Sequence, residues 1–239
     1  NKGRTISTMG CTVNTIQDKW PDEFIGLLAA GMRIGQFTRF TCFLENHLIG
    51  DPTFHFTDNA GLDMDINSTL VLEEGNTVFW KKQLKSPMAD MQAMALRQLS
   101  MADCKGLVDL LKKSYYESDY FVVRLEALRL LALNYPTEAV DVLKTAMNDS
   151  YELIRRYAVE YVEKNSNPKL LPAWIEGYLL RGHENRYRFR FFSGIDIFDH
   201  DTALNELTRQ SADWSFYDPS YVKELSEYYP RRKEGLERD

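Results

Sequence analysis

The sequence has few cysteines and lacks the motifs of the major enzyme classes. Its three cysteines, Cys11, Cys42 and Cys104, are odd in number and widely spaced, which excludes a complete disulfide framework and a C-x-x-C metal site. The motifs of serine hydrolases, zinc metallopeptidases, P-loop NTPases and dinucleotide-binding enzymes are absent. The four histidines lie at no spacing typical of metal ligands. We therefore expect no cofactor.

The chain also lacks long apolar runs and an excess of positive charge. No stretch of about 18 apolar residues is present, so we predict no transmembrane segment. With 29 basic and 35 acidic side chains the net charge is −6, and we do not expect general binding to nucleic acid. The chain begins with Asn1 and shows no signal-peptide pattern, which predicts a processed product or a piece of a longer protein.

Short alternating patterns predict a small α/β subdomain over residues 1–86. Apolar and polar residues alternate over 11–16 and 53–57, as is typical of half-buried strands. A helix is predicted to begin at Pro21, because proline and the following acid suit a helix start. Two apolar runs within 70–80 flank a four-residue turn, which predicts a β-hairpin.

From residue 87 onward the apolar period changes from 2 to 3.6, and the pattern repeats. Four segments align on a small residue, at spacings of 32, 31 and 35, and a second amphipathic helix is predicted between consecutive segments. The aligned small residues are Ala95, Ala127, Ala158 and Ser193. A helix pair of this kind buries its apolar stripes only by stacking on its neighbours, so the pattern predicts a helical repeat array. A further helix is predicted to begin at Pro219.

The repeated residues resemble those of HEAT repeats over roughly residues 87–200. Asp119 and Asp149 match the turn aspartate of that family, and Arg124 and Arg155 match its internal arginine. The resemblance implies a right-handed α-solenoid over 87–239 with a C-terminal capping helix, in which these four residues make inter-repeat polar contacts. The fold prediction is therefore a mainly α protein, with the solenoid preceded by the small α/β subdomain and its hairpin.

A second resemblance covers roughly residues 20–56, which include a glycine-spaced helix and then the stretch 46–56, Asn-His-Leu-Ile-Gly-Asp-Pro-Thr-Phe-His-Phe. This stretch is similar to the strand and turn near the end of gingipain-type cysteine peptidases, which have a caspase fold. The resemblance implies that Cys11 is a candidate nucleophile and that the protein acts outside the cytoplasm, as a secreted or periplasmic protein. The His-Gly pair of that family is absent. A thiol without a neighbouring base has a pKa of about 8.5 and reacts slowly at neutral pH, so we do not expect this chain alone to be a peptidase.

An arginine-aromatic stretch is the best candidate for a ligand or partner groove. Four arginines, Arg181, Arg186, Arg188 and Arg190, alternate with aromatic residues near position 190. Such interleaving can bind an anion or single-stranded nucleic acid. On a helix the aromatic residues would instead form the core side, which leaves the arginines for solvent or for an inner groove.

A partial calcium-loop match lies in the N-terminal part. Asp63, Asp65, Asn67 and Glu74 have the spacing of EF-hand ligands, but Ser68 stands where the loop requires glycine. The neighbouring apolar residues alternate with the acids, which favours an edge strand over a metal loop.

Together these features favour a non-catalytic scaffold that binds a protein or peptide on the concave face of a short α-solenoid. The sequence leaves two alternatives open. One is the C-terminal portion of a gingipain-like peptidase whose histidine lies upstream, and the other is anion or nucleic-acid binding through the arginine-aromatic stretch.

Overall fold

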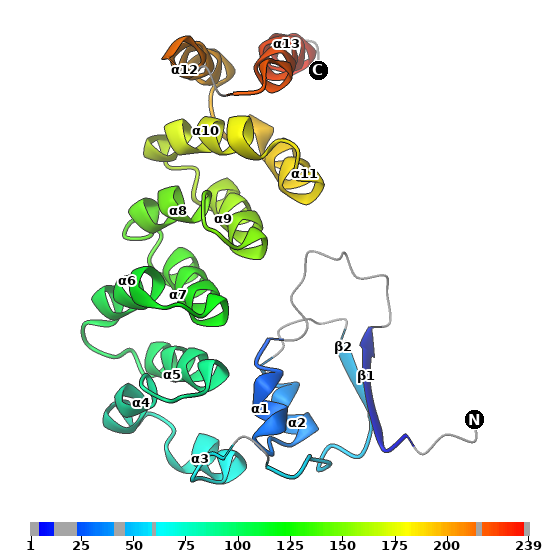
Figure 1. Cartoon of the computed structure of the whole chain (residues 1–239), viewed down its shortest axis with the longest axis vertical. Helices are drawn as coiled ribbons and strands as arrows, with labels where there is room; N and C mark the ends of the chain where they lie inside the picture. The colour runs from blue at the N-terminus through cyan, green and yellow to red at the C-terminus, as the bar shows by residue number, and fades with distance from the viewer. Residues whose placement is uncertain (1–4, 12–22, 41–45, 59–60, 214–216, 237–239) are drawn as a thin grey trace. The chain divides into compact units, whose positions relative to one another are not determined.

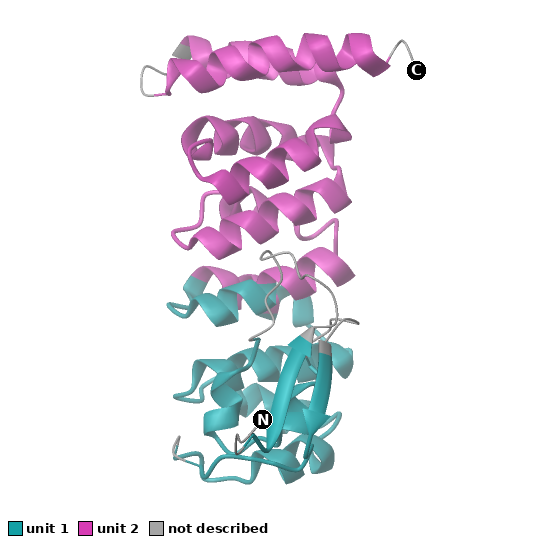
Figure 2. Cartoon of the chain, turned by 90° about the vertical axis from the view of Figure 1, so that its right-hand side faces the viewer, with its two compact units in different colours: residues 1–110, 117–127 teal, residues 111–116, 128–239 magenta. Residues whose placement is uncertain are grey.

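The computed structural model describes residues 5–11, 23–40, 46–58, 61–213 and 217–236. Over these residues the chain is mainly helical and contains one two-stranded antiparallel sheet (Figure 1). The chain divides into two compact units (Figure 2). Unit 1 is residues 1–110 with 117–127, and unit 2 is residues 111–116 with 128–239. The predicted mainly α class is confirmed, while the boundary predicted after residue 86 stays a prediction.

The sheet of unit 1 joins two strands that are far apart in the sequence. Strand β1 (Ser7–Cys11) pairs antiparallel with β2 (Asn46–Gly50), so that Ser7 lies opposite Gly50 and Cys11 opposite Asn46. Gly50 has φ +117°, and a Cβ there would overlap the carbonyl of Ile6. Only glycine suits both constraints. Of the strand predicted over 11–16, Cys11 lies in β1, and residues 12–16 lie outside the described part.

Two one-turn helices replace the single helix predicted to begin at Pro21, which itself lies outside the described residues. They are α1 (Gly26–Ala29) and α2 (Ile34–Phe37). The chain turns between them at Gly31, whose φ of +81° breaks a right-handed helix. Leu27 of α1 and Phe37 of α2 are buried, together with Phe24 before α1 and Met32 between the two helices.

The strand predicted over 53–57 is wrong, because Pro52 and Thr53 form a turn and residues 54–57 have no regular secondary structure. The Asp51 carboxylate accepts hydrogen bonds from the Thr53 amide (2.8 Å) and hydroxyl (2.7 Å), which lowers the Asp51 pKa. The segment then lies against the start of α2, where the carbonyls of Pro52 and Phe54 accept from the amides of Gly35 and Ile34.

The hairpin predicted over 70–80 is also wrong. These residues belong to α3 (Ile66–Leu72) and α4 (Thr77–Gln83), which are joined by a short loop. Each helix has a side-chain N-cap: Asp65 accepts from the Asn67 amide, and Asn76 accepts from the Phe79 amide. The buried apolar residues Ile66 and Leu70 are four apart, which is a helical spacing that we interpreted as strand.

The helical pattern predicted from residue 87 is confirmed. Helix α5 (Ala89–Met101) belongs to unit 1, while α6 (Leu107–Glu117) and α7 (Phe121–Asn134) contribute residues to both units. The remaining helices belong to unit 2 and are α8 (Val140–Ala146), α9 (Glu152–Asn165), η1 (Pro168–Leu170), α10 (Leu171–Arg181), α11 (Asn185–Ser193), η2 (Ile195–Ile197), α12 (His200–Asp213) and α13 (Pro219–Leu236).

Unit 2 is built from successive helix pairs. Helix α8 packs on α9, α10 on α11, and α12 on α13 (Figure 1). Between pairs, α9 packs on α11 and α10 packs on α12. The first helices of two consecutive pairs, α10 and α12, therefore contact each other, and so do the second helices α9 and α11. This is the arrangement expected of a helical repeat.

The fourth repeat has a different register from the predicted one. Ala95, Ala127 and Ala158 are fully buried on α5, α7 and α9, but Ser193 is exposed. The residue at the corresponding distance from the start of α11 is Phe191, which is fully buried and stacks on Trp174 at 4.6 Å between ring centroids. The repeat therefore continues at a spacing of 33 and needs no insertion.

A close approach between α10 and α11 is set by Gly177. A Cβ at this position would overlap the hydroxyl oxygen of Tyr187, a fully buried ring whose hydroxyl has no hydrogen-bond partner. We expect Gly177→Ala to lower the free energy of unfolding by about 1–3 kcal/mol, because the buried ring cannot retreat. Adding Tyr187→Phe should recover most of that loss, since it removes the overlapping atom. Urea denaturation followed by circular dichroism measures both effects.

Gly235→Ala is the matched control for this pair. It also places alanine in a helix, and nothing lies within 4 Å of the added Cβ. Alanine should raise stability there by about 0.5–1 kcal/mol through helix propensity. If Gly177→Ala behaves like Gly235→Ala, the close approach does not constrain the helix pair.

Candidate functional site

A polar contact recurs at the start of the second helix in three repeats. In each, a long polar side chain in the first turns donates a hydrogen bond to the backbone carbonyl of the residue six positions earlier. The donor–acceptor pairs are Gln92–Ser86 (2.7 Å), Arg124–Ser118 (3.1 Å) and Arg155–Asp149 (2.6 Å). The bond ties each helix to the turn that precedes it. Gln92 makes this contact with its side-chain amide, where the other two repeats have arginine.

The acceptor residues also cap the turn with their side chains. The oxygens of Ser86, Ser118 and Asp149 accept hydrogen bonds from the amides two residues later, at 3.3, 3.2 and 2.9 Å. The structure therefore places Ser118 at the repeat position of Asp149. Asp119 follows it, and its carbonyl also accepts from Arg124 at 3.2 Å.

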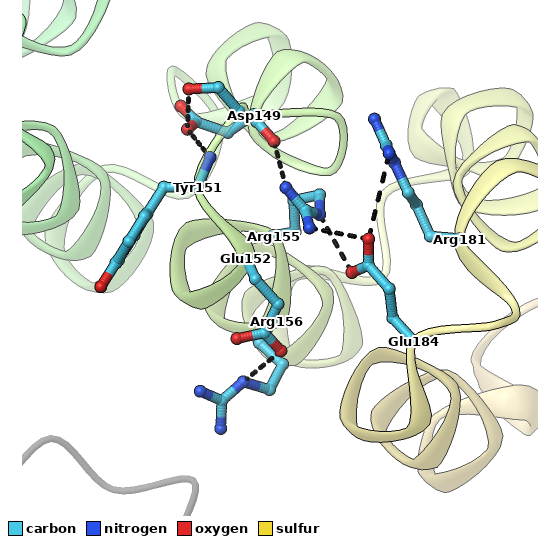
Figure 3. Close-up of polar contacts among 8 residues, drawn as sticks. Asp149, Tyr151, Glu152, Arg155, Arg156, Arg181 and Glu184 are labelled. Carbon is cyan, nitrogen blue, oxygen red and sulfur yellow. Dashed lines mark hydrogen bonds and ion pairs between the residues drawn. The ribbon is translucent and has the colours of Figure 1, made fainter.

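Besides its bond to the turn before α9, the Arg155 side chain also contacts the next helix pair (Figure 3). Its guanidinium donates two hydrogen bonds to the Glu184 carboxylate, at 3.1 and 2.7 Å, and Arg181 approaches the same carboxylate at 3.9 Å. Tyr115 donates to the Asp149 carboxylate at 3.0 Å. Arg155 is almost fully buried, so this network links the α9 turn to the turn before α11.

The four arginines predicted as a groove face different partners. Arg181 lies near Glu184, Arg190 lies 3.7 Å from Glu160, and Arg188 forms an ion pair with Glu224 of α13. Arg186 is exposed. The structure therefore does not gather them into one pocket, and carboxylates lie beside three of them.

Arg188 belongs to a cluster between α10, α11 and α13. Its guanidinium carbon lies 5.4 Å from the centre of the Phe192 ring, and Glu224 also accepts a hydrogen bond from Tyr178. Burial and the neighbouring carboxylate raise the pKa of the Tyr178 hydroxyl, so it stays protonated as a donor.

An open hollow of about 400 Å³ lies along α13 next to this cluster. It is lined by Ser220, Lys223, Glu224, Glu227, Tyr228 and Arg231. All six lie on one helix and carry charges of both signs, so the hollow alone selects no ligand class.

Cys11 lies at the end of β1. The strand register places Asn46 opposite Cys11, and His47 opposite Gly10. The peptidase alternative stays a prediction.

The four residues of the partial calcium match have separate roles or are exposed. Asp65 caps α3, while Asn67 accepts from the Arg33 amide and donates to the Gly31 carbonyl. Asp63 and Glu74 are exposed. Over the part of the chain that the structure describes, no group of three or more His, Cys, Asp or Glu side chains could hold a metal ion.

A buried ionic cluster in unit 1 was not predicted from the sequence. Arg97 donates two hydrogen bonds of 2.7 Å to the Glu126 carboxylate, and it also pairs with Glu23 and with the Phe40 carbonyl (3.1 Å). Its guanidinium carbon lies 4.4 Å from the centre of the Phe24 ring. The cluster joins the 23–40 segment to α5 and α7.

No protein-family model, no curated protein and no solved structure matches this chain. In the described ranges, none of the helices has the length and hydrophobicity needed to cross a membrane.

Proposed function

We propose that this chain is a non-catalytic scaffold that binds a protein or peptide on the concave face of a short, right-handed HEAT-like α-solenoid. The supporting observation is the recurring contact made by Gln92, Arg124 and Arg155, which recurs every 31 or 32 residues. A contact repeated in register indicates that each helix pair is one copy of a common unit. Arrays of such units present long continuous surfaces, and binding is their common use.

The second helices of the pairs supply the proposed binding face. On α11 this face carries Phe189, a large apolar side chain that is 59% exposed. Arg186 and Arg190 neighbour it on the same helix, so the face combines an aromatic residue with charge. Such a combination is typical of protein-binding surfaces, where aromatic residues and arginine are enriched.

Site-specific photocrosslinking in the native host tests this function. A benzophenone amino acid at Phe189 should capture one defined partner, because the side chain lies on the proposed face. The same probe at Thr208, an exposed residue of α12 in the other helix layer, is the control and should capture none. The proposal fails if Phe189 captures no protein, or if both positions capture the same mixture.

A further inference from the structure

The second helices of the repeats share a second contact, which runs diagonally from one helix to the next. The helices align on the residues before their first turns, which are Met88, Tyr120, Tyr151 and Glu184. In this register Arg97 of α5 and Glu160 of α9 both occupy the ninth position, while Glu126 of α7 and Arg190 of α11 both occupy the sixth.

Both units make this diagonal contact, but with opposite charges. In unit 1 the arginine is on the earlier helix, and Arg97 forms two hydrogen bonds of 2.7 Å with Glu126. In unit 2 the acid is on the earlier helix, and Glu160 lies 3.7 Å from Arg190. The first contact is a tight bidentate pair, whereas the second is longer than a hydrogen bond.

In unit 1 a segment of the chain itself covers the contact. Glu23 brings a carboxylate to Arg97, and Phe24 places its ring 4.4 Å from the guanidinium carbon. The side chains of Arg97 and Glu126 are consequently only 8% and 1% exposed. The consecutive residues Glu23 and Phe24 are therefore an internal example of what this helix face binds, which is an acid next to an aromatic ring.

In unit 2 the corresponding contact is more exposed to solvent than in unit 1. The side chains of Arg190 and Glu160 are 18% and 21% exposed, and Arg186 and Phe189 lie on the same side of α11 as Arg190. Glu160 also accepts a hydrogen bond from Lys164 at 2.7 Å. Its charge is thus shared between two cations, and α11 itself carries three arginines and no acidic residue.

We propose that Glu160, Arg186, Phe189 and Arg190, the α9–α11 surface, bind a peptide segment that presents a carboxylate next to an aromatic ring. The carboxylate pairs with Arg190, and the ring packs beside the guanidinium and against Phe189, as Glu23 and Phe24 do around Arg97. The inference deepens the proposed scaffold function and rests on it. Charge complementarity and the internal example in unit 1 identify the same partner chemistry.

Photocrosslinking with defined peptides tests the partner chemistry. Three soluble dodecapeptides share one Gly/Ser-rich sequence and differ only in the residue before the aromatic residue, which is Glu, Gln or Lys. The aromatic residue in all three is the photoreactive benzoylphenylalanine, and the peptides are named Glu-Phe, Gln-Phe and Lys-Phe. Each is irradiated with the whole purified chain, and the crosslinked residues are mapped by mass spectrometry. The Glu-Phe peptide should crosslink to α9 and α11 at least fivefold more than the Lys-Phe peptide, because only its acid complements the arginines.

Variants of the protein separate a specific site from a general attraction. Arg190→Glu and the milder Arg190→Gln should each reduce the Glu-Phe crosslinks at least fivefold, with an unchanged circular dichroism spectrum. Arg209→Glu is the control, since Arg209 is an exposed arginine of α12, and it should leave the yield unchanged. Crosslinks outside α9 and α11, equal yields from the three peptides, or full yield from Arg190→Gln would each overturn the inference. The crosslinking experiment at Phe189 in the native host is independent of these results. The scaffold function can therefore be correct even where the predicted peptide specificity is wrong.

Discussion

Replacing Arg97 with methionine is expected to lower the free energy of unfolding by about 3–5 kcal/mol. The substitution keeps most of the side-chain volume but removes the guanidinium that pairs with the buried carboxylates of Glu23 and Glu126. An acid left in an apolar environment must either remain charged at a large desolvation cost or take up a proton. Urea denaturation followed by circular dichroism measures this loss of stability. The loss should appear in the unfolding of unit 1.

Two further variants show whether the charges or the packing cause the loss. Arg231→Met removes an exposed arginine whose ion pair with Glu227 lies on the surface of α13, and it should change stability by less than about 0.5 kcal/mol. The triple variant with Arg97→Met, Glu23→Leu and Glu126→Leu should recover much of the loss, because no unpaired charge remains. A loss below about 1 kcal/mol for Arg97→Met would show that the acids do not depend on this arginine.

The ionic cluster also shows where sequence reasoning stops. The period of the apolar residues after position 87 predicts the helices well, because one amphipathic pattern extends over many turns. Arg97 and Glu126, in contrast, lie on helix faces whose counterparts in unit 2, Arg190 and Glu160, are partly exposed to solvent. The burial of Arg97 and Glu126 depends on residues 23–40, which are distant in sequence and carry no periodic signal. A contact between residues so far apart in the sequence does not change the spacing of nearby apolar residues, so the sequence pattern does not reveal it.

Short segments misled the prediction for a related reason. In the 70–80 region Thr77 and Val78 are β-branched, and a Gly-Asn turn precedes them, so local propensity favours a hairpin. The caps of Asp65 and Asn76 and the burial of Trp80 favour helices instead, and tertiary packing decides between the two. The family resemblance pairs Asp119 with Asp149, which places the turn before α7 one residue too late. Hydrogen bonding shows that Ser118 performs the same capping.

Replacing Arg155 with leucine is expected to lower the free energy of unfolding by about 2–4 kcal/mol. One guanidinium holds the Asp149 carbonyl at 2.6 Å and the Glu184 carboxylate at 3.1 and 2.7 Å (Figure 3). Leucine removes the donor that both acceptors share, and the nearest atom of Arg181 is 3.9 Å from Glu184, which is too far for a hydrogen bond of similar strength. Chemical denaturation measures the loss, and protease susceptibility at the loop after residue 181 should increase with it.

A double-mutant cycle isolates the bond between the two turns from the loss of side-chain packing. Glu184→Leu alone removes the other partner, and combining it with Arg155→Leu should cost less than the sum of the single variants by about 1–3 kcal/mol. Lys164→Leu is the matched control on the same helix, because its pair with Glu160 is more exposed and should contribute about 0.5 kcal/mol or less. Strict additivity of the two substitutions would mean that the repeats are held together by their apolar contacts alone. A coupling energy in the expected range would instead make Arg155 the residue that fixes the register between α9 and α11, and therefore the geometry of the surface on which the proposed peptide binds.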